Sequence, residues 1–365
     1  MNIVLIAPEK ANGGITSWAS SFVNNIRRIT TKATVLQIDN SPLFRSLTPT
    51  LFTRIITGGI ELVYVSLKLV EKIIKTKRNS IVHATTSGSL GCIRDIAVGI
   101  ICKCFRIKAV LHCHYGCLTD NLQSNRFFKS ILLFSLRTFN QIWVLDSKSL
   151  SALNQIDVLN GKVHLTPNPI EISNPADLRP KKYAEIAFCG NLIPTKGILE
   201  LVKAATKCSV GLHIIGPGSS AVEAQIRAIA GNLMDKSIIL HGRLPNDEVI
   251  ELLKTVDIVA LPTYYPSEAF PMSILEAMSL GKLVISCRRA AIPDILTAND
   301  GTSCGLLVEP KSVDSLVEAI QWCQTHKDEA DLMCKKAYEK VYACYRKEVV
   351  YDVYRNNYKS LLSLD

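Results

Sequence analysis

The sequence predicts an α/β protein built from two doubly wound, Rossmann-like parallel-sheet domains in tandem. Two series of six short apolar runs alternate with helical segments along the chain. Within each run the apolar residues are continuous, which is typical of strands buried on both faces of a parallel sheet. A proline-rich stretch separates the two series. The 365 residues, of which 48% are apolar and 20% charged, suit two globular domains of ordinary size.

The first series predicts an N-terminal domain over residues 1–170. Its strands are expected at 2–8, 33–39, 80–86, 108–114, 141–147 and 163–169. The stretch 167–181 carries four prolines and is the best linker candidate. Helical segments between the runs indicate right-handed βαβ connections.

The second series predicts a C-terminal domain over residues 171–344. Its strands are expected at 185–190, 210–216, 237–242, 257–262, 282–287 and 305–310. The stretch from 330 to 364 is predicted as helix, and tyrosines recur along it at helical spacings, which indicates core packing. We expect its last part, about 345–365, to pack back on the first domain. A central cleft between the two domains is the expected ligand site.

Positive charge is concentrated in the first half of the chain. Residues 1–170 hold 20 Lys and Arg against 8 Asp and Glu, a formal charge of +12, whereas the remaining residues hold 22 against 24. Such asymmetry suggests that the first half meets an anionic surface: membrane headgroups, an anionic lipid carrier or nucleic acid. Nucleic acid is disfavoured, because the basic residues are not interleaved with exposed aromatic platforms.

The segment 43–77 is apolar with interspersed cations, so it could lie on a membrane surface. An ordinary helical connection packed on the first sheet would have the same pattern, and the two readings are compatible. The cations are Arg45, Arg54, Lys68, Lys72, Lys75, Lys77 and Arg78, the last directly after the segment.

Neither a secretory signal nor an apolar run long enough to cross a bilayer is evident, so we expect a cytoplasmic protein, at the inner face of the membrane if the basic half binds lipid. The twelve cysteines are scattered, which indicates reduced core thiols. One cluster has side chains that can bind a metal: His112, Cys113, His114 and Cys117. A zinc site is disfavoured, because no second pair of ligands with matching spacing follows.

The stretch 262–281 carries the strongest functional signal. A loop containing Pro262, Pro266 and Pro271 follows an apolar strand, and a helix from about Met272 is ended by Gly281. The loop holds Glu268 and the helix holds Glu276. Ligands bind at the carboxyl ends of parallel strands, and a helix N-terminus there favours phosphate. Taken alone, both carboxylates could equally be solvated surface groups.

Two glycine loops occupy equivalent places after other strands. Asn12, Gly13 and Gly14 follow the first strand, and the loop from Gly190 to Gly197 places Lys196 at a helix start. Glycines let the backbone approach a phosphate or a sugar closely, and the lysine suits a diphosphate. A tight turn and a surface lysine are the alternative readings. Neither loop is the G-x-G-x-x-G dinucleotide fingerprint.

Together these motifs resemble the retaining, nucleotide-sugar-dependent glycosyltransferases of GT-B fold, in the fourth family, which builds bacterial polysaccharides. Glu268 to Glu276 resembles that family's E-x7-E signature, followed by EAM-x-x-G through Gly281. The N-terminal GG loop, Lys196 with Gly197, the PNP linker and the strand GLLVEP add to the resemblance, which covers most of the chain.

The resemblance implies roles for individual residues. Glu276 would hold the ribose hydroxyls, Glu268 would lie near the donor sugar, and Lys196 would bind the diphosphate. The loop from Ala269 to Ser273 would cradle the sugar and its phosphate, and Gly13 and Gly14 would face the phosphates. The expected catalytic residues are Glu268, Lys196 and His114; the expected donor-binding residues are Gly13, Gly14, Gly190, Asn191, Arg243, Ala269, Phe270, Pro271, Met272, Ser273, Ile274 and Glu276.

Three positions depart from the family pattern. Asn191 stands where the family usually has an arginine beside the diphosphate, so charge neutralisation would depend on Lys196 and Arg243. Ala269 replaces a common glycine, and AAIPD, ending at Asp294, replaces a GG-x-PE run. These departures affect individual donor contacts.

The expected reaction is transfer of a hexose or N-acetylhexosamine from a nucleotide sugar, with UDP as the expected nucleotide, to a lipid-linked or oligosaccharide acceptor in O-antigen or capsule synthesis. Charge develops on the leaving phosphate, so cations and amide N–H groups would stabilise it. No D-x-D pair is present, so we expect neither metal nor other cofactor. The family implies front-face attack with retention.

A glycosidase fits poorly, because its two carboxylates must flank one bond. The remaining alternatives are a catalytically inactive nucleotide-sugar-binding protein and a Rossmann-type epimerase.

Overall fold

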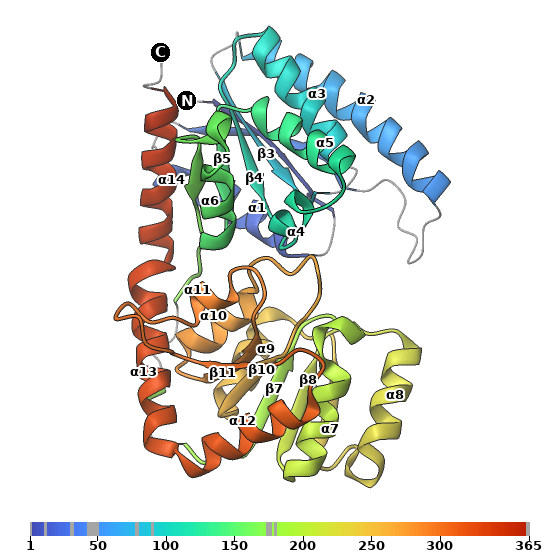
Figure 1. Cartoon of the computed structure of the whole chain (residues 1–365), viewed down its shortest axis with the longest axis vertical. Helices are drawn as coiled ribbons and strands as arrows, with labels where there is room; N and C mark the ends of the chain where they lie inside the picture. The colour runs from blue at the N-terminus through green and yellow to red at the C-terminus, as the bar shows by residue number, and fades with distance from the viewer. Residues whose placement is uncertain are drawn as a thin grey trace. The chain divides into compact units, whose positions relative to one another are not determined.

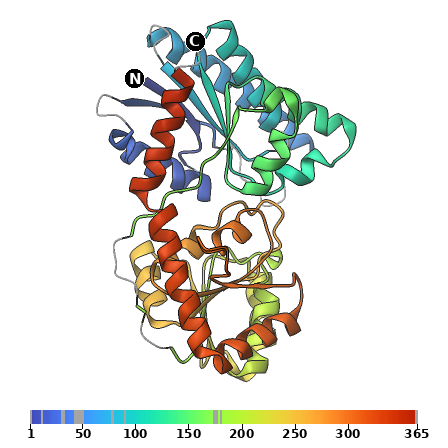
Figure 2. The same cartoon turned by 60° about the vertical axis from the view of Figure 1, so that its left-hand side comes forward.

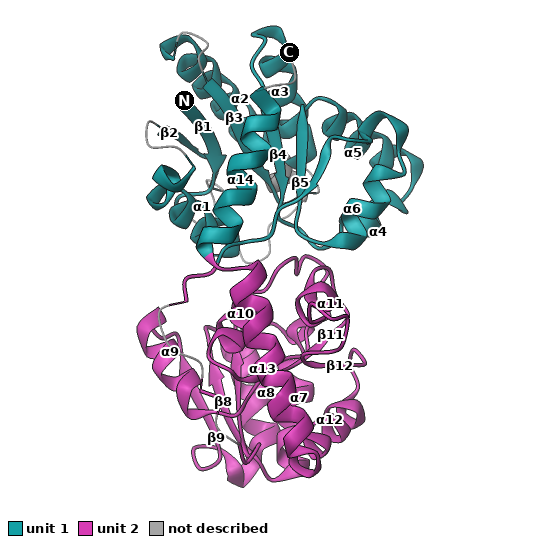
Figure 3. Cartoon of the chain, turned by 90° about the vertical axis from the view of Figure 1, so that its left-hand side faces the viewer, with its two compact units in different colours: residues 1–169, 347–365 teal, residues 170–346 magenta. Residues whose placement is uncertain are grey.

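Two parallel β-sheets with helices on both faces make up the computed structural model of the protein (Figures 1 and 2). It describes residues 2–10, 13–29, 33–41, 51–76, 80–88, 91–172, 177–178 and 181–362, with the backbone alone for 51–55. The chain divides into two compact units (Figure 3), and each is described by itself. The first unit comprises Met1–Pro169 and Lys347–Asp365, and the second comprises Ile170–Arg346.

The first unit holds a six-stranded sheet in the order β2-β1-β3-β4-β5-β6. All its strand pairs are parallel, from β1 with β2 to β5 with β6. The strands are β1 (Asn2–Ala7), β2 (Thr34–Asp39), β3 (Ser80–Thr86), β4 (Ala109–Cys113), β5 (Gln141–Val144) and β6 (Val163–Leu165). Its α-helices are α1 (Gly14–Asn24), α2 (Leu51–Lys75), α3 (Gly91–Cys104), α4 (Leu118–Leu122), α5 (Arg126–Arg137), α6 (Ser147–Asn154) and α14 (Lys347–Leu362).

The second unit holds another six-stranded parallel sheet, in the order β12-β11-β10-β7-β8-β9. The strands are β7 (Glu185–Cys189), β8 (Gly211–Ile215), β9 (Ile238–Gly242), β10 (Ile258–Leu261), β11 (Leu283–Cys287) and β12 (Leu306–Val308). Its α-helices are α7 (Ile198–Cys208), α8 (Ser220–Ala230), α9 (Asn246–Thr255), α10 (Met272–Ser279), α11 (Ile292–Ile295), α12 (Val313–Thr325) and α13 (Lys327–Cys344). The prediction of two doubly wound parallel sheets is confirmed. Each of the twelve expected strands is present: β3 has the expected bounds, and the others are one to four residues shorter.

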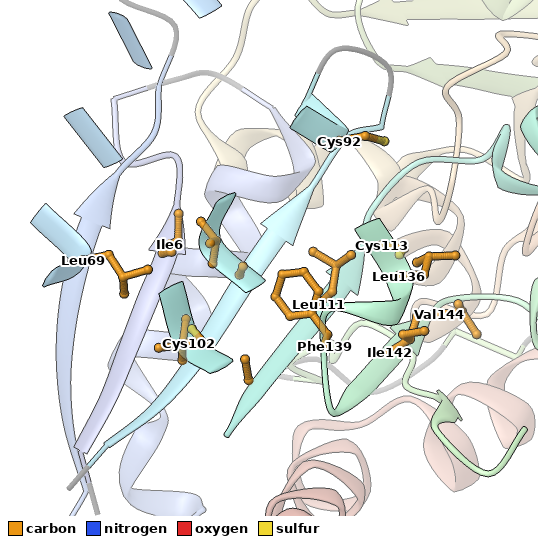
Figure 4. Packing of buried hydrophobic residues seen from close by; sticks show 14 of the residues in the cluster. Ile6, Leu69, Cys92, Cys102, Leu111, Cys113, Leu136, Phe139, Ile142 and Val144 are labelled. Carbon is orange, nitrogen blue, oxygen red and sulfur yellow. The ribbon is translucent and has the colours of Figure 1, made fainter. Parts of the chain in front are cut away.

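One face of the first sheet is covered by α2, α3 and α5. Val65 and Leu69 of α2, Cys102 of α3 and Leu136 of α5 are buried in one cluster with strand residues such as Leu111 (Figure 4). Each helix thus buries one apolar side against the sheet, as an amphipathic helix does.

The other face of the first sheet is covered by α1 and α14. Trp18 and Phe22 of α1 pack with Trp143 of β5 and with Tyr354 and Tyr358 of α14. This core therefore needs residues from both ends of the chain. Figure 2 shows α14 lying across the strands of this sheet.

The stretch 330–364, predicted as helix, is helical up to Leu362 with a short break. Helix α13 ends at Cys344, and α14 begins at Lys347. Between them the backbone pairs with another segment, because the Ile170 N–H donates to the Tyr345 carbonyl at 2.8 Å. The tyrosines divide accordingly: Tyr351, Tyr354 and Tyr358 are buried in the first unit, whereas Tyr342 of α13 is 48% exposed.

The predicted surface segment 43–77 contains the 25-residue helix α2. Arg45, Lys77 and Arg78 lie outside the described residues, as does the side chain of Arg54. In the part of the chain that the structure describes, no helix is both long enough and apolar enough to cross a membrane.

The expectation that basic residues lack exposed aromatic neighbours is wrong. Phe127 and Phe128 are 70% and 56% exposed on α5, beside the exposed side chains of Arg126 and Lys129. These phenylalanines therefore share a surface with cations.

The cysteines are all free thiols. Cys104 is exposed, and four others are partly exposed. The buried cysteines are Cys92, Cys102, Cys113, Cys287, Cys304, Cys323 and Cys334. Burial of this larger group agrees with the expected core thiols.

Candidate functional site

The loops after β7 and β10 meet at one edge of the second sheet. These two strands are direct neighbours, with Ile186 paired to Ile258. Parallel neighbours end at the same edge, so the loop with Lys196 and the loop with Glu268 come together there. The Tyr264 N–H donates to the Thr195 carbonyl at 2.9 Å and joins the two loops.

Lys196 and Glu268 form an ion pair at this edge. The Lys196 Nζ lies 3.2 Å from Glu268 Oε2, and the two side chains are 16% and 11% exposed. The hydroxyl of the buried Thr263 donates to the same carboxylate oxygen at 3.2 Å. A shielded ammonium held in this way is placed to meet an incoming anion.

Gly197 allows the close approach of the two loops. Its φ of +77° is left-handed, and a Cβ there would lie 2.3 Å from the Pro262 carbonyl oxygen. Only glycine fits both the backbone conformation and the contact. A Cβ at Gly190 would lie 3.6 Å from the Lys196 Nζ, so the backbone of Gly190 passes beside the ammonium.

Glu276 is half-buried in the second turn of α10. Burial raises the pKa of its carboxyl group. The thiol of Cys189, at the end of β7, shows where Glu276 lies. Burial raises the pKa of this thiol to about 12; the nearby Glu276 carboxylate raises it further, and the Lys196 ammonium lowers it. Glu276 and Lys196 therefore both lie near the end of β7.

The side chains of the loop 269–271 and of the first residues of α10, up to Ile274, are partly or fully buried. Phe270 is buried against Tyr345, with ring centroids 5.6 Å apart, and Ile274 is fully buried. The Ala269 carbonyl accepts from the Ala291 N–H at 3.1 Å.

Helix α10 begins directly after this loop. Pro271 precedes its first turn, and Met272 and Ser273, which are half-buried, start it. N–H groups in the first turn of a helix favour an anion.

Two further predicted donor contacts are exposed. Asn191 is exposed directly after Gly190. Arg243 is exposed after β9, the edge strand, and β8 separates that strand from β7.

The remaining predicted residues belong to the first unit. Gly13 is exposed and Gly14 begins α1, directly after the loop that follows β1. His114 follows β4 and is 8% exposed. Its ring lies 4.0 Å from that of His112 and 4.8 Å from that of Trp18, between centroids. Burial lowers the pKa of His114 to about 3, so the imidazole is neutral.

No group of three or more metal-binding side chains occurs among the described residues. His112 and Cys113 lie on opposite faces of β4, because His112 packs on Trp18 and Cys113 packs in the core under α3 and α5. The alternation of side chains along a strand separates them.

Residues 170–340, almost the whole second unit, match the family described as "Glycosyl transferases group 1". Over these residues the chain is similar to the glycosyltransferase group 1 family. Lys196, Glu268 and Glu276 all lie within the matched residues.

Curated relatives that are similar to this domain include bacterial enzymes. The D-rhamnosyltransferase WbpZ of Pseudomonas aeruginosa is 27% identical over 41% of this chain and 38% of its own length. The lipopolysaccharide 1,2-N-acetylglucosaminetransferase of Salmonella typhimurium is 25% identical over 45% of each chain. The chain thus spans less than half the length of these two relatives.

The fold extends over the whole chain. A crystal structure of Anabaena HepE in complex with UDP and glucose matches with a TM-score of 0.71 and 15% identity, and the match covers 100% of both chains. Together with the two parallel sheets, this match shows that the chain has the GT-B fold.

Sequence reasoning missed several residues that the structure places beside the predicted ones. Thr263 holds the Glu268 carboxylate, and its only signal is its place after a strand end. His83 joins the histidines near His114, with its Nε2 3.3 Å from His112 Nδ1 and its Nδ1 2.5 Å from the Tyr358 hydroxyl. No spacing in the sequence connects Tyr358 with β3.

Proposed function

We propose that the protein is a retaining glycosyltransferase that moves a hexose or N-acetylhexosamine from a UDP-sugar to a lipid-linked or oligosaccharide acceptor. The observation that carries the proposal is the shielded Lys196–Glu268 pair beside the first turn of α10. The match of HepE, whose structure holds UDP and glucose, supports the choice of nucleotide. The lipopolysaccharide N-acetylglucosaminetransferase among the relatives supports a role in cell-surface polysaccharide synthesis, of the O-antigen or capsule type.

Lys196 would bind the diphosphate of the donor. As the bond from the sugar to the phosphate breaks, negative charge grows on the phosphate oxygens and the sugar ring becomes cationic. The Lys196 ammonium and the N–H groups of the first turn of α10 would stabilise the phosphate without a metal ion. The departing phosphate would accept the proton of the attacking acceptor hydroxyl.

Glu268 would act beside the sugar and Glu276 beside the nucleotide. Thr263 and Lys196 hold the Glu268 carboxylate at the sheet edge, where it would contact sugar hydroxyls. Glu276 would accept hydrogen bonds from the ribose hydroxyls. Its raised pKa reflects a carboxylate with little solvation, which two hydroxyl donors would compensate.

In the first unit, we propose that Gly13 and Gly14 face the phosphates and that the neutral His114 lies near the acceptor and the sugar. This unit would bind the acceptor, and the second unit would bind the donor. We also propose a cytoplasmic enzyme that contacts anionic lipid at the inner face of the membrane, because the positive charge lies in residues 1–170.

A thermal-shift panel followed by a transfer assay tests the proposal. The full chain is mixed with UDP, GDP, UDP-glucose, UDP-galactose and UDP-N-acetylglucosamine, and UDP and one UDP-sugar should raise the melting temperature. Transfer of the radiolabelled sugar to a bacterial lipid extract should persist in EDTA. A shift with GDP alone would overturn the UDP assignment, and loss of transfer in EDTA that Mn²⁺ restores would overturn the metal-free mechanism. Binding without transfer or donor hydrolysis would indicate an inactive binding protein.

A further inference from the structure

Exposed apolar side chains gather on three neighbouring helices of the first unit. The described residues include seventeen large hydrophobic side chains that are exposed, and eleven of them lie on α2, α3 and α5: six, two and three respectively. These helices cover the same face of the first sheet (Figure 1), so their outer sides face the same way. Single exposed hydrophobics are ordinary, but a contiguous group indicates an interaction surface.

Helix α2 has two apolar stripes on opposite sides. The inner stripe, with Val65, Leu69 and Ile73, is fully buried against the sheet. The outer stripe follows the same helical spacing and is 46–68% exposed; it consists of Ile56, Ile60, Val63, Leu67 and Ile74. At about 100° per residue the two stripes lie roughly half a turn apart. Packing against the sheet explains the inner stripe and leaves the outer one without a partner in the described residues.

Cations lie along one side of the outer stripe of α2. At the same 100° per residue, Lys68 and Lys75 fall on one side of the helix, between the two stripes, and the partly buried Lys72 lies nearer the inner stripe. Of the two acidic residues on α2, Glu61 binds the guanidinium of Arg94 in α3 at 2.9 Å and is therefore turned towards the protein. Glu71 is paired with Lys68 at 2.8 Å.

Helices α3 and α5 extend this surface. Ile93 and Ile100 lie seven residues apart on α3 and are 49% and 43% exposed. Phe127 and Phe134 lie seven residues apart on α5 and are 70% and 51% exposed. Seven residues are about two turns, so each pair lies on one side of its helix. Arg126 and Lys129 add exposed cations beside Phe127.

We propose that the outer sides of α2, α3 and α5 form a bilayer-docking surface, in which the apolar side chains enter the lipid below anionic headgroups and the flanking cations bind those headgroups. The inference rests on the membrane contact proposed above and assigns the surface that makes it. An amphipathic face with large apolar residues and lysine borders is what interfacial binding requires. The charge of +12 in residues 1–170, against −2 in the remainder, supplies the attraction.

Two other occupants fit less well. In a two-fold dimer through this face, each helix would contact the same helix, or a neighbouring cationic helix, of the second copy. The lysines of the two copies would then lie close together and repel each other. A nucleic acid would use the cations and phenylalanines, but the aliphatic stripe of α2 offers no base stacking. A bilayer with anionic headgroups would contact the cations, the phenylalanines and the aliphatic side chains alike.

Vesicle sedimentation of the full chain tests the surface. Vesicles of phosphatidylcholine alone are compared with vesicles of equal parts phosphatidylcholine and phosphatidylglycerol, at low and high salt. The wild type should sediment with the anionic vesicles and less so at high salt. Leu67→Ser combined with Phe127→Ser should weaken partitioning about tenfold or more. Lys68→Glu combined with Lys75→Glu should weaken it about a hundredfold at low salt.

Matched controls come from the second unit, on α13. Leu332 is 52% exposed and Lys335 is exposed, so Leu332→Ser and Lys335→Glu change the same kinds of residue elsewhere and should leave sedimentation unchanged. All variants should keep the wild-type melting temperature, because the substituted side chains are exposed or lie on the edge of the surface.

Four outcomes would overturn the surface. They are no vesicle binding by the wild type, binding that the α2 and α5 variants leave intact, a dimer in light scattering that Leu67→Ser with Phe127→Ser dissolves, and RNA binding that displaces vesicles. Transfer to a water-soluble acceptor, measured without vesicles, should be unchanged in these variants. If the wild type binds vesicles but no UDP-sugar, the proposed function fails and the docking surface stands.

Discussion

The Nζ of Lys196 lies 3.2 Å from Oε2 of Glu268, across two loops that come from neighbouring strands. The pair keeps the ammonium in place before a donor arrives, so little rearrangement is needed when a diphosphate binds. Removing one member leaves the other shielded and without its partner, which has a cost for stability as well as for function. Tests of this pair must therefore separate turnover from folding.

Lys196→Ala and Glu268→Gln are each expected to lower kcat/KM with a UDP-sugar by about 10²-fold or more, because each removes charge from the reacting centre. Lys207→Ala removes a lysine that is 58% exposed and should leave kcat/KM unchanged. Steady-state transfer and thermal melting are measured on all three variants. Wild-type kcat/KM in both site variants would remove Lys196 and Glu268 from the mechanism.

Gly197→Ala is expected to destabilise the protein by about 1–3 kcal/mol and to lower activity, because its left-handed φ and its contact with Pro262 both exclude a Cβ. Gly301 has a similar φ of +82° but open space around its Cβ. Gly301→Ala therefore carries the backbone strain without the contact and should cost about 1 kcal/mol. Chemical unfolding compares the two variants. Equal losses in both would mean that the approach of the two loops does not require Gly197.

Glu276→Gln is expected to weaken UDP binding about tenfold or more while raising the melting temperature of the ligand-free protein. The neutral amide loses the charge-assisted bonds to ribose, yet it avoids the burial of a carboxylate whose pKa is already raised. Calorimetric titration with UDP and thermal melting measure the two effects. The exposed Glu251→Gln serves as the control and should change neither. Unchanged UDP affinity in Glu276→Gln would contradict the role at the ribose.

Stability is expected to fall as the pH decreases from about 6.5 towards 3. Burial lowers the pKa of His83 and of His114 from 6.5 to about 3, and the charge of His114 adds to the effect on His83. Below pH 6.5 these histidines are protonated in the unfolded chain but stay neutral in the folded chain. Above pH 6.5 they are neutral in both states. Each histidine contributes a slope of about 1.4 kcal/mol per pH unit in this window.

Urea unfolding followed by tryptophan fluorescence measures this slope, because Trp18 and Trp143 lie against the histidines. His326 is exposed in the second unit, so His326→Gln should leave the slope unchanged. A free energy of unfolding that stays constant from pH 7 to 5 would show that the histidines are protonated in the folded protein.

The strands were predictable because each is a continuous apolar run, and burial on both faces requires such runs. The meeting of Lys196 with Glu268 followed from the rule that parallel strands end at one edge. Thr263 carries no such signal, because a threonine after a strand is common and only the fold turns its hydroxyl to Glu268.

Other features depend on tertiary contacts that local sequence does not contain. The break between α13 and α14 arises where Tyr345 pairs with Ile170, far away in sequence. The outward phenylalanines of α5 could not be told from its inward leucines, because the whole segment 126–137 is rich in apolar residues. Packing in the folded protein decides which side of α5 faces the sheet.

The last helix affects the order in which the two units can fold during synthesis. Because α14 supplies Tyr351, Tyr354 and Tyr358 to a core that otherwise comes from residues 3–143, the first unit to emerge from the ribosome is the last to be completed. Until residue 361 is made, the surfaces of Trp18 and Trp143 lack their cover, and a nascent chain would depend on chaperones or on partial structure at this sheet. The second unit, contiguous from Ile170 to Arg346, has no such delay. A stop codon in the final helix would therefore damage the half of the protein that was translated first.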